Sequence, residues 1–560
     1  MKQYIIKQVK AAGMLCACLL LLATGTLTSC VKDDGSYDYT ELPEISFQGI
    51  PEVTEVLAYI DHINISPKFV SSTEGEIKSG DPNWSVQYRL GYKGMGNFGV
   101  NEEGTGTIVW KDLTPASGFD LDVPAEFSTG TYQLWVTLTD NRNQSVTSKQ
   151  YDVIVGSTTY EGWLVLCNEG AEERARLDMI TKLSSTRTEA IHDIAKGLPT
   201  LHHATCINSW PQGSAPGDRI NLFTEEGSYN LDAESLETEE SNEFNGLNFA
   251  FDPEEIIIKE DVFACAEYSW LQKYKVCFSE NGNAYVLTDG IGGAAYSVPI
   301  NNLKEGEGAQ FRVAPYCGYS WVRPWSSAYG EYMLFYDIDN KRFLLFKGAA
   351  DYYYNPIHLQ LNVIPDPSAD EANLFSYSTG KDFVYMQSTR RSNGLVYTIL
   401  QDPTTGKRSV YGINLGGSGY AQELYVPEVN APDFEKATQF AFDNRFPLLF
   451  YSVGNKLYCY NLALGSTNEV TTGLGANEEI TKIKFNLYRA TDYTTLANQS
   501  EAFMNQQYRL VVCSYDNGNT DGGRVTFYDV DGTSNTATKG ESYDGFAKIV
   551  DIIYRERTAE

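Results

Sequence analysis

Residues 332–346, YMLFYDIDNKRFLLF, contain two apolar runs on either side of a short polar segment. The two apolar runs, Tyr332–Tyr336 and Phe343–Phe346, are rich in aromatic and aliphatic side chains and are too short for a stable helix. The segment between them, Asp337–Lys341, is polar and carries Asp and Asn, which hairpin turns favour. The stretch therefore predicts two antiparallel strands joined by a tight turn.

The same kind of unit recurs toward both ends of the chain. Seven apolar runs begin such units, at residues 162–166, 219–223, 284–287, 332–336, 382–386, 447–451 and 508–512. Their starts are separated by 48 to 65 residues, which is room for four strands and their loops. Seven units predict a seven-bladed β-propeller from residue 157 to residue 560. The alternative is an irregular pair of β-sandwiches built from the same hairpins.

The end of the chain predicts how such a ring closes. Ile480–Phe485 leads into the last unit, and a similar strand at residues 547–554 is left over after it. A ring left open would expose unpaired strand edges, so we expect the late strand to complete the first blade. Helix is expected only at Glu172–Lys182 and Glu189–Ala195.

The segment from residue 43 to residue 156 also consists of strands and turns. Residues 130–140 alternate apolar and polar side chains, turn at Asn141–Asn143 and return through Tyr151–Val155. This hairpin follows a strand that begins at Trp84, and its Gly-x-Tyr start and Thr-Asp end resemble PKD-like, immunoglobulin-type domains. The resemblance implies a β-sandwich.

Composition agrees with an all-β chain and excludes several classes of protein. Hydrophobic residues make up 42% of the 560 residues, too many for a disordered chain. Aromatic residues at 13% and 48 glycines suit many short strands and turns. The formal net charge of −30 disfavours binding to the phosphate backbone, so no nucleic-acid partner is expected.

The N-terminus predicts a lipid anchor. Lysines precede the apolar run Ala11–Leu27, so residues 1–29 have the pattern of a secretory signal peptide. Leu27-Thr28-Ser29-Cys30 resembles the lipobox of bacterial lipoproteins, which implies cleavage before Cys30 and lipidation of its thiol. An uncleaved anchor helix is the alternative. Residues 30–42 would form an acidic tether.

The residues that follow Cys30 resemble the start of one family of lipoproteins. Val31–Gly35 is similar to the export tag of Bacteroidetes lipoproteins that reach the outer face of the outer membrane, although any acidic linker would have this composition. Together with Tyr37-Asp38-Tyr39, this start resembles the PKD-like family lipoproteins of Bacteroidetes. The resemblance implies a surface-exposed outer-membrane protein that accompanies a SusC/SusD-type nutrient uptake complex and binds an oligosaccharide or a peptide.

Motifs for catalysis or metal binding are missing from the sequence. It contains no GxSxG, HExxH, GxxxxGK[ST] or CxxC pattern, so no catalytic residue, metal ligand or cofactor is assigned. His202 and His203 are adjacent and are expected to be structural. Residues 516–523 form either a plain hairpin loop or a calcium loop. A propeller-type glycan hydrolase or lyase and a structural or adhesive surface protein with a protein partner remain as alternative functions.

The cysteines are expected to be mostly buried free thiols. Cys16 and Cys18 leave with the signal and Cys30 is lipidated, which leaves an odd number that cannot all pair. At most one or two disulfides are expected among the seven that remain. These are Cys167, Cys206, Cys265, Cys277, Cys317, Cys459 and Cys513.

Aromatic side chains are unusually dense in two loops, residues 316–325 and 351–356. Exposed rings next to polar groups can stack on sugar faces or hold peptide side chains, whereas packing between blades is the alternative reason for their presence. The proline in each loop argues against a central strand. The predicted ligand-binding residues are Trp321, Arg323, Trp325, Tyr352, Tyr353, Tyr354 and, outside these loops, Trp270.

Overall fold

The computed structural model describes most of the chain from residue 43 to residue 555. The described residues are 43–58, 61–92, 110–127, 130–159, 161–182, 188–210, 219–232, 236–250, 256–264, 274–288, 296, 298–303, 309–319, 332–347, 360–368, 373–416, 419–487 and 505–555. Almost all of their regular structure is strand. Within these described ranges, helix is limited to α2 (Phe244–Asn248) and to the 3₁₀ turns η1 (Glu240–Asn242), η2 (Arg391–Asn393), η3 (Phe434–Lys436) and η4 (Gln506–Tyr508).

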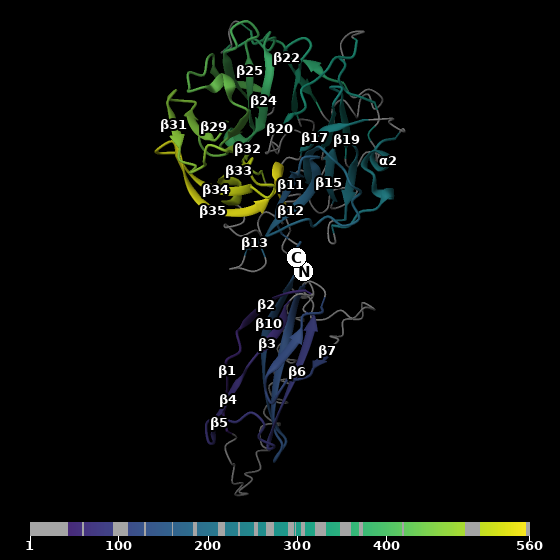
Figure 1. Cartoon of the computed structure of the whole chain (residues 1–560), viewed down its shortest axis with the longest axis vertical. Helices are drawn as coiled ribbons and strands as arrows, with labels where there is room; N and C mark the ends of the chain where they lie inside the picture. The colour runs from purple at the N-terminus through teal and green to yellow at the C-terminus, as the bar shows by residue number, and fades with distance from the viewer. Residues whose placement is uncertain are drawn as a thin grey trace, which may run out of the picture.

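The strands before residue 157 share one hydrophobic core, in the lower part of Figure 1. The largest sheet has the order β2 (Val53–Leu57), β10 (Ser145–Gly156), β9 (Gly130–Asp140), β6 (Trp84–Tyr92), β7 (Trp110–Leu113). Two smaller sheets are β1 (Ile45–Gln48) with β4 (Lys68–Ser71) and β5 (Gly75–Ile77), and β3 (His62–Ile65) with β8 (Leu121–Pro124).

The alternation in β9 explains why these sheets pack together. Every second side chain from Tyr132 to Asp140 is buried, because successive residues of a strand point to opposite faces of the sheet. The expected hairpin is confirmed, since Asp140 pairs with Ser145 and Gly130 with Val155.

From Gly162 to Arg555 the described residues form seven small antiparallel sheets in a propeller-like arrangement (Figure 1). The first has β11 (Gly162–Glu169), β12 (Arg174–Lys182), β13 (Thr188–Ile191) and β36 (Lys548–Arg555); the second, β14 (Ala204–Trp210), β15 (Arg219–Thr224) and β16 (Ser228–Leu231); the third, β17 (Ile258–Ala264), β18 (Tyr274–Ser279) and β19 (Ala284–Thr288).

The other four sheets each have four strands. The fourth has β20 (Gly318–Tyr319), β21 (Met333–Asp337), β22 (Arg342–Phe346) and β23 (Asn362–Val363); the fifth, β24 (Asp382–Ser388), β25 (Leu395–Gln401), β26 (Arg408–Asn414) and β27 (Ala421–Val426). The sixth has β28 (Gln439–Phe442), β29 (Leu448–Val453), β30 (Lys456–Asn461) and β31 (Thr467–Val470); the seventh, β32 (Glu478–Lys484), β33 (Arg509–Asp516), β34 (Gly523–Asp531) and β35 (Thr536–Phe546).

Packing between sheets explains the apolar runs of the sequence. Strand β21 is buried over its whole length, and so is most of β29 and β33. Both faces of these strands contact a neighbouring sheet, so their side chains need not alternate between apolar and polar. One core cluster joins Leu448 and Phe450 of the sixth sheet to Leu510 and Val512 of the seventh.

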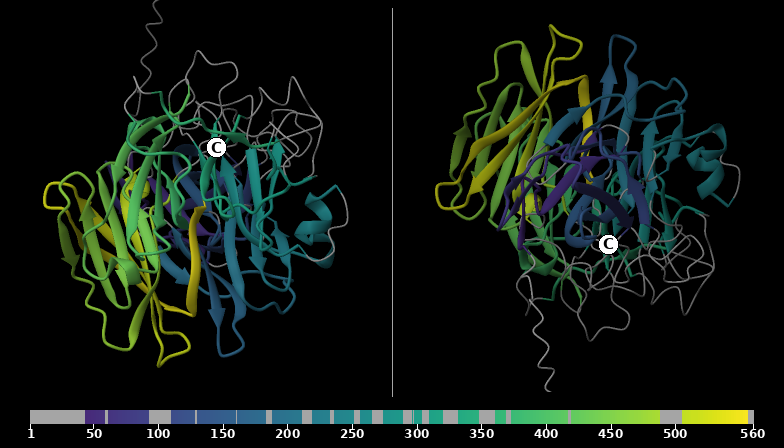
Figure 2. Two further views of the ribbon diagram at one scale, coloured as in Figure 1. Left: turned by 90° about the horizontal axis from the view of Figure 1, so that it is seen from above. Right: turned by 90° about the horizontal axis from the view of Figure 1, so that it is seen from below.

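The two ends of this region meet in one sheet. Strand β36 pairs antiparallel with β11, with Val165 opposite Ile552, and Figure 2 shows the yellow C-terminal strand beside the blue strands of the first sheet. This confirms the prediction for the late strand. The segment expected to lead into the last unit is β32, which also confirms its assignment.

Both expected helices are wrong. Glu172–Lys182 contains β12, which returns from a turn with positive φ at Gly170 and Glu173 and pairs with β11. Residues 189–195 contain the end of β13, which pairs with β12, and Asp193 has a φ of +50° that no α-helix contains. Pairing with a buried strand therefore outweighs the helix propensity of these segments.

Two of the seven apolar runs belong to strands that are not equivalent to the others. Residues 284–287 lie in the third strand of their sheet, and 382–386 lie in the first strand of theirs. The equivalent second strands begin at 162, 219, 274, 333, 395, 448 and 509. Successive starts are therefore 53 (395 to 448) to 62 (333 to 395) residues apart, a narrower range than the one predicted from the apolar runs. Apolar character alone does not distinguish neighbouring strands of such a sheet.

The thiols agree with the expectation for six of the seven cysteines. Cys167, Cys206, Cys277, Cys317, Cys459 and Cys513 are buried and free, and Cys265 lies outside the described residues. Among the helices of the described residues, none combines the length and apolar character needed to cross a bilayer.

Candidate functional site

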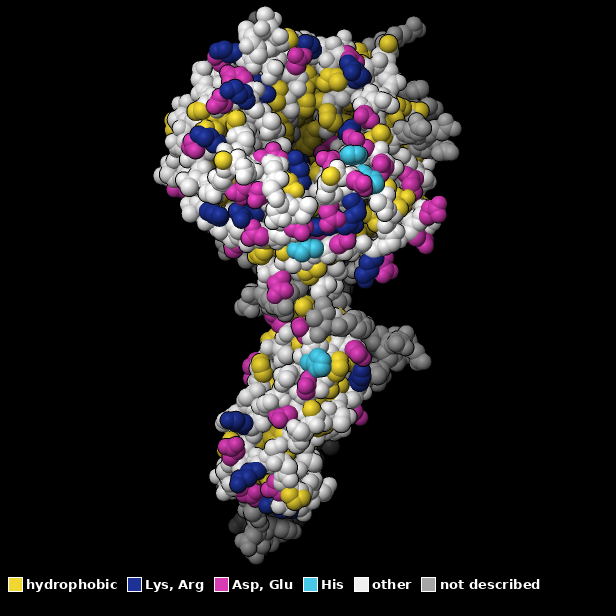
Figure 3. All heavy atoms as spheres, viewed as in Figure 1, with side chains coloured by type: hydrophobic (Ala, Val, Ile, Leu, Met, Phe, Trp, Pro, Cys, Tyr) yellow, Lys and Arg dark blue, Asp and Glu magenta, His cyan; other side chains and the backbone are white. Residues whose placement is uncertain are grey.

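A cavity of about 190 Å³ lies where the innermost strands of the seven sheets meet. Its wall takes side chains from β14, β17, β20, β24, β28, β32 and β36, one strand from each sheet. Figure 3 shows the corresponding hollow in the face of the ring. Because segments from residue 208 to residue 554 contribute to it, the cavity exists only in the assembled ring.

One side of the wall carries a lysine pair bound to an aspartate. The Nζ atoms of Lys482 and Lys484 lie 3.3 and 3.0 Å from Oδ1 of Asp551. The two lysines are two residues apart on β32, so their side chains extend from the same face, and β36 places Asp551 against them. The other oxygen of Asp551 accepts a hydrogen bond from the Ile207 amide at 3.4 Å.

The lysines keep Asp551 ionised. Burial alone would raise the pKa of this carboxyl group, which is only 4% exposed. The two ammonium groups and the hydrogen bonds outweigh burial and hold its pKa at about 2. In turn burial would lower the pKa of Lys482, but Asp551 and Glu260 raise it above its ordinary value. Lys482 still has 29% of its side chain exposed, since it faces the open space of the cavity.

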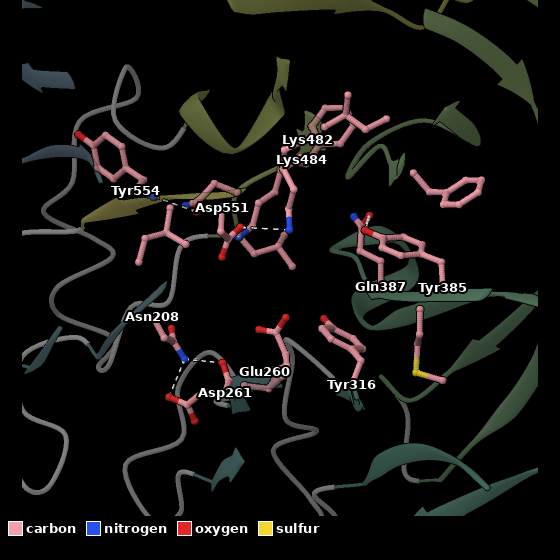
Figure 4. A pocket seen from close by; sticks show the side chains of 18 of the residues that line it. Asn208, Glu260, Asp261, Tyr316, Tyr385, Gln387, Lys482, Lys484, Asp551 and Tyr554 are labelled. Atoms are coloured by element: carbon pink, nitrogen blue, oxygen red, sulfur yellow. Dashed lines mark hydrogen bonds and ion pairs between the residues drawn. The ribbon is translucent and has the colours of Figure 1, made fainter. Parts of the chain in front are cut away.

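Glu260 on β17 is the second carboxylate of this group. In Figure 4 its carboxylate points into the space beside Tyr316 and across from the Asp551–Lys484 pair. Within the described residues its side chain makes no hydrogen bond and no ion pair within 4 Å. Burial and the charge of Asp551 raise its pKa to about 7, although both lysines act in the opposite direction.

The neighbouring Asp261 has a structural role. Its carboxylate accepts hydrogen bonds from Asn208 at 3.2 Å and Asn221 at 3.4 Å, and the thiol of Cys277 lies 3.8 Å away. Asn208 also donates to the Asp261 carbonyl oxygen at 2.6 Å. These bonds join the second and third sheets and leave Glu260 as the less constrained acid of the two.

The opposite side of the wall is aromatic and uncharged. Tyr385 donates a hydrogen bond to Oε1 of Gln387 at 3.0 Å, and Gln387 exchanges two bonds of 2.8 Å with the backbone of Phe442. Tyr316 accepts a bond from the Ser388 amide at 3.4 Å. Burial raises the pKa of Tyr316 and of Tyr385 above the ordinary value, so both hydroxyls stay neutral.

Together the wall offers hydrogen-bond donors, one adaptable acid and flat rings. Lysine ammonium groups can donate to carboxylate, carbonyl or hydroxyl oxygens, and Glu260 can accept a hydrogen bond or hold a proton. Tyrosine rings can cover the apolar face of a sugar or of a side chain. The site can therefore bind a small polar group and can also move a proton.

The residues predicted to bind ligand lie outside the described residues. These are Trp321, Arg323, Trp325, Tyr352, Tyr353, Tyr354 and Trp270, and the predicted lipid site Cys30 is outside them as well. The start of the first aromatic loop is described, and there Tyr316 and Tyr319 line the cavity while Cys317 packs in the core between sheets. The described start of the loop therefore packs in the core and borders the cavity, and ligand binding by the predicted residues stays a prediction.

The other sequence candidates have structural partners. His202 contacts Glu226 and His203 contacts Glu173, each at 2.8 Å, so the adjacent imidazoles bind different carboxylates. Residues 516–523 join β33 to β34 as a hairpin loop, in which Asp516 accepts a bond from the Gly518 amide and Asp521 pairs with Arg176. Among the described residues, no group of three or more His, Cys, Asp or Glu side chains is arranged to hold a metal ion.

Sequence reasoning missed the charged residues of the cavity. Their signal was a charge inside an apolar strand: lysines alternate with Ile483 in the segment leading into the last unit, and Asp551 interrupts the apolar late strand. Glu260, in the run EIIIKEDVF, is surrounded by other acids and gives no such signal.

Comparisons with known proteins identify no family. No family model and no curated protein matches the chain. A quinoprotein alcohol dehydrogenase-like protein from Bacteroides thetaiotaomicron is similar in structure, with 11% identity and a TM-score of 0.36, over 91% of this chain and 99% of the other.

Two more solved structures are similar to the same degree. A protein from Lactobacillus plantarum has 11% identity and a TM-score of 0.39, over 71% of this chain and 100% of the other. A protein of unknown function from B. thetaiotaomicron has 10% identity and a TM-score of 0.28, over 85% and 96%. Similarity at this level carries no information about what this chain binds.

Proposed function

We propose that this protein binds a section of an oligosaccharide or a peptide in the cavity at the centre of the ring. The observation that carries the proposal is the wall of that cavity, in which all seven innermost strands place charged, amide and aromatic side chains around one space. Such concave sites with a few convergent polar groups are where proteins commonly bind small ligands.

The proposal includes the architecture and the location predicted from the sequence. Seven small sheets closed by β36 support a seven-bladed β-propeller, and the shared core of residues 45–156 supports a PKD-like sandwich before it. The resemblance of residues 27–39 to Bacteroidetes lipoproteins supports a lipid on Cys30, outer-membrane anchoring with the body facing the exterior, and a SusC/SusD-type partner. The protein would then deliver ligand to that partner.

A retention assay tests the binding function. The chain from Val31 onward is passed over a panel of immobilised polysaccharides and peptide digests, and both retention and released products are measured. Ser209 lines the cavity and is half-buried, so Ser209→Trp should fill the space without removing a core side chain. Thr404→Trp, in the exposed turn before β26, is the matched control. Retention that Ser209→Trp abolishes and Thr404→Trp preserves supports the proposal; equal retention of both variants contradicts it.

A second candidate function is a glycan hydrolase or lyase. The observation that favours it is Glu260, an acid with a pKa of about 7 beside the neutral hydroxyl of Tyr316. An acid with a pKa near the working pH is suited to transfer protons in catalysis. In that case the panel releases products, and Glu260→Gln stops their release without unfolding the chain. Retention without products leaves the binding function as the better account.

The lipid anchor has its own test. Cys30→Ala should leave the precursor uncleaved and unlabelled by a radioactive fatty acid, whereas the unmodified sequence should be cleaved and labelled. Labelling of Cys30→Ala at the normal level would contradict the assignment.

A further inference from the structure

The cavity wall carries two positive charges, on Lys482 and Lys484, and Asp551 neutralises only one of them. Lys482 and Lys484 share one carboxylate oxygen of Asp551, so the three groups together keep one positive charge. Each ammonium group has three hydrogens, which leaves donors for a further acceptor. About 30% of each lysine side chain is exposed, and both lysines line the cavity.

Glu260 can supply the second negative charge, but its ionised form is destabilised by its surroundings. It faces the same space and makes no hydrogen bond with any described residue, so its ionised form is stabilised by the lysines from a distance and not by direct contacts. Burial and the repulsion from Asp551 oppose that form. If another anion binds the lysines, it offsets their positive charge, so they no longer stabilise the ionised form of Glu260.

We propose that the cavity binds a carboxylate group of its ligand on Lys482 and Lys484, and that Glu260 takes up one proton from solvent as this group arrives. The charge of the site is then conserved, because the ligand brings one negative charge and Glu260 loses one. This inference rests on the proposed binding function and names the chemical class of the ligand. The carboxylate can come from a uronic acid unit or from the C-terminus of a peptide, and the experiment separates the two.

The direction of the pH dependence follows from the groups that surround Glu260. A bound anion raises the pKa of Glu260 further above its value of about 7 in the empty site. Binding therefore takes up a proton above pH 7, and affinity falls by up to about tenfold per pH unit there. Below pH 7 the acid is protonated in both states and the dependence ends. The charged and titratable groups that face or surround Glu260 are Asp551, Lys482, Lys484, Asp261, Tyr316, Tyr385, Cys206 and Cys277.

Calorimetry measures both parts of the proposal. Sodium glucuronate is compared with glucose, and acetyl-glycylglycine with its C-terminal amide, on the chain from Val31 onward at pH 6.0 and 8.0. At each pH two buffers of different ionisation enthalpy report the protons taken up. We expect an acid to bind at least about tenfold more tightly than its neutral counterpart, with close to one proton taken up at pH 8.0 and none at pH 6.0. The probe that binds identifies the source of the carboxylate.

Variants assign the effect to residues. Glu260→Gln should bind the same acid with no proton uptake and no change in affinity between the two pH values. Lys484→Met should weaken binding of the acid, whereas Lys484→Arg keeps the charge and should restore most of it. A thermal unfolding curve for each variant separates lost binding from lost folding.

Three results overturn the proposal: a neutral probe that binds as tightly as its acid, proton release on binding, or no binding of either acid at pH 6.0. Proton release would mean that ligand hydroxyls donate to ionised Glu260. If polymer retention is still blocked by Ser209→Trp in these cases, only the carboxylate proposal fails and the binding function stands. If retention is also absent, both fail.

Discussion

At the scale of a single residue, Glu260 makes the folding stability depend on pH. Its folded pKa of about 7 lies above the ordinary value of 4.5, mainly because of burial. Below pH 4.5 the folded and unfolded chains both hold the proton, and this group costs nothing. As the pH rises from 4.5 to 7 the unfolded chain ionises first, so folding stability falls, and above pH 7 the loss is constant.

Replacing Glu260 by Gln should remove this loss. We expect Glu260→Gln to exceed the original chain in free energy of unfolding at pH 8 by about 1 to 3 kcal/mol, and to differ little from it at pH 4. Urea denaturation at both pH values measures the difference. Glu126→Gln, at an exposed position away from the cavity, is the control and should have no effect at either pH. A variant that is less stable at pH 8 would show that the Glu260 carboxylate is favourable where it is.

Asp551 has the opposite pH dependence. Its folded pKa of about 2 lies below the ordinary 3.8, because two lysines and the hydrogen bonds outweigh its burial. Its stabilising effect is present above pH 4 and is lost as the pH falls toward 2. The combined contribution of these two carboxyl groups to folding stability is therefore most favourable between these two ranges, near pH 4 to 5.

The sequence does not predict which individual residues meet in the cavity. Lys482 and Lys484 were visible as charges in an apolar strand, but their common partner Asp551 is 67 residues away from Lys484 in the chain. Both strands, β32 and β36, are predicted from the sequence, but which of their side chains meet depends on how the strands are placed in space. The aromatic residues that were predicted lie outside the described residues, so their role stays a prediction.

At the scale of the secondary-structure elements, a buried network of ion pairs joins strands of the first and last sheets. Arg176 on β12, 6% exposed, pairs with Glu169 and with Asp178, whose side chain is fully buried. The same guanidinium reaches Asp521 at 3.1 Å and the Gly545 carbonyl oxygen at 3.2 Å, both in the last sheet or its loops. It therefore connects segments more than 340 residues apart.

Removing this guanidinium should be costly. Arg176→Met leaves the buried Asp178 with His192, the Cys167 thiol and a backbone amide as remaining partners, and we expect a loss of about 3 kcal/mol in the free energy of unfolding. Guanidinium chloride denaturation measures it. Arg312→Met, which removes an exposed pair with Asp339, should change stability little. Equal effects of the two substitutions would contradict the role given to the network.

Most elements of the fold could be predicted, and the errors have a common physical cause. Strands with continuous apolar runs, such as β21 and β33, were visible because both of their faces are buried. The sequence of β12 predicts a helix because its Arg, Leu and Met residues also favour helices, whereas its charged side chains belong to the buried network just described. Apolar runs at 284–287 and 382–386 were placed in the wrong strand since neighbouring strands of a sheet are equally apolar.

At the scale of the whole molecule, β36 joins the two ends of the region from Gly162 to Arg555. This strand completes the first sheet, lies next to β14 and β32 and contributes Asp551 to the cavity. Without it the edge of β11 would be free to pair with another chain.

A truncation tests the role of β36. A chain that ends at Ala547 lacks β36, so we expect its seven sheets to unfold without a cooperative thermal transition and the chain to self-associate, as measured by calorimetry and light scattering. A chain that ends at Arg555 keeps β36 and should behave as the full chain does. A monomeric, cooperatively unfolding chain that ends at Ala547 would show that the ring is stable without closure.

The cavity between the seven innermost strands is the binding site that we propose. The most direct measurement is calorimetric binding of a ligand identified by retention, compared between the original chain, Ser209→Trp and Thr404→Trp. We expect one site per chain, unchanged in Thr404→Trp and lost in Ser209→Trp while thermal unfolding stays the same. Equal affinity for all three chains would place the site elsewhere and contradict the account.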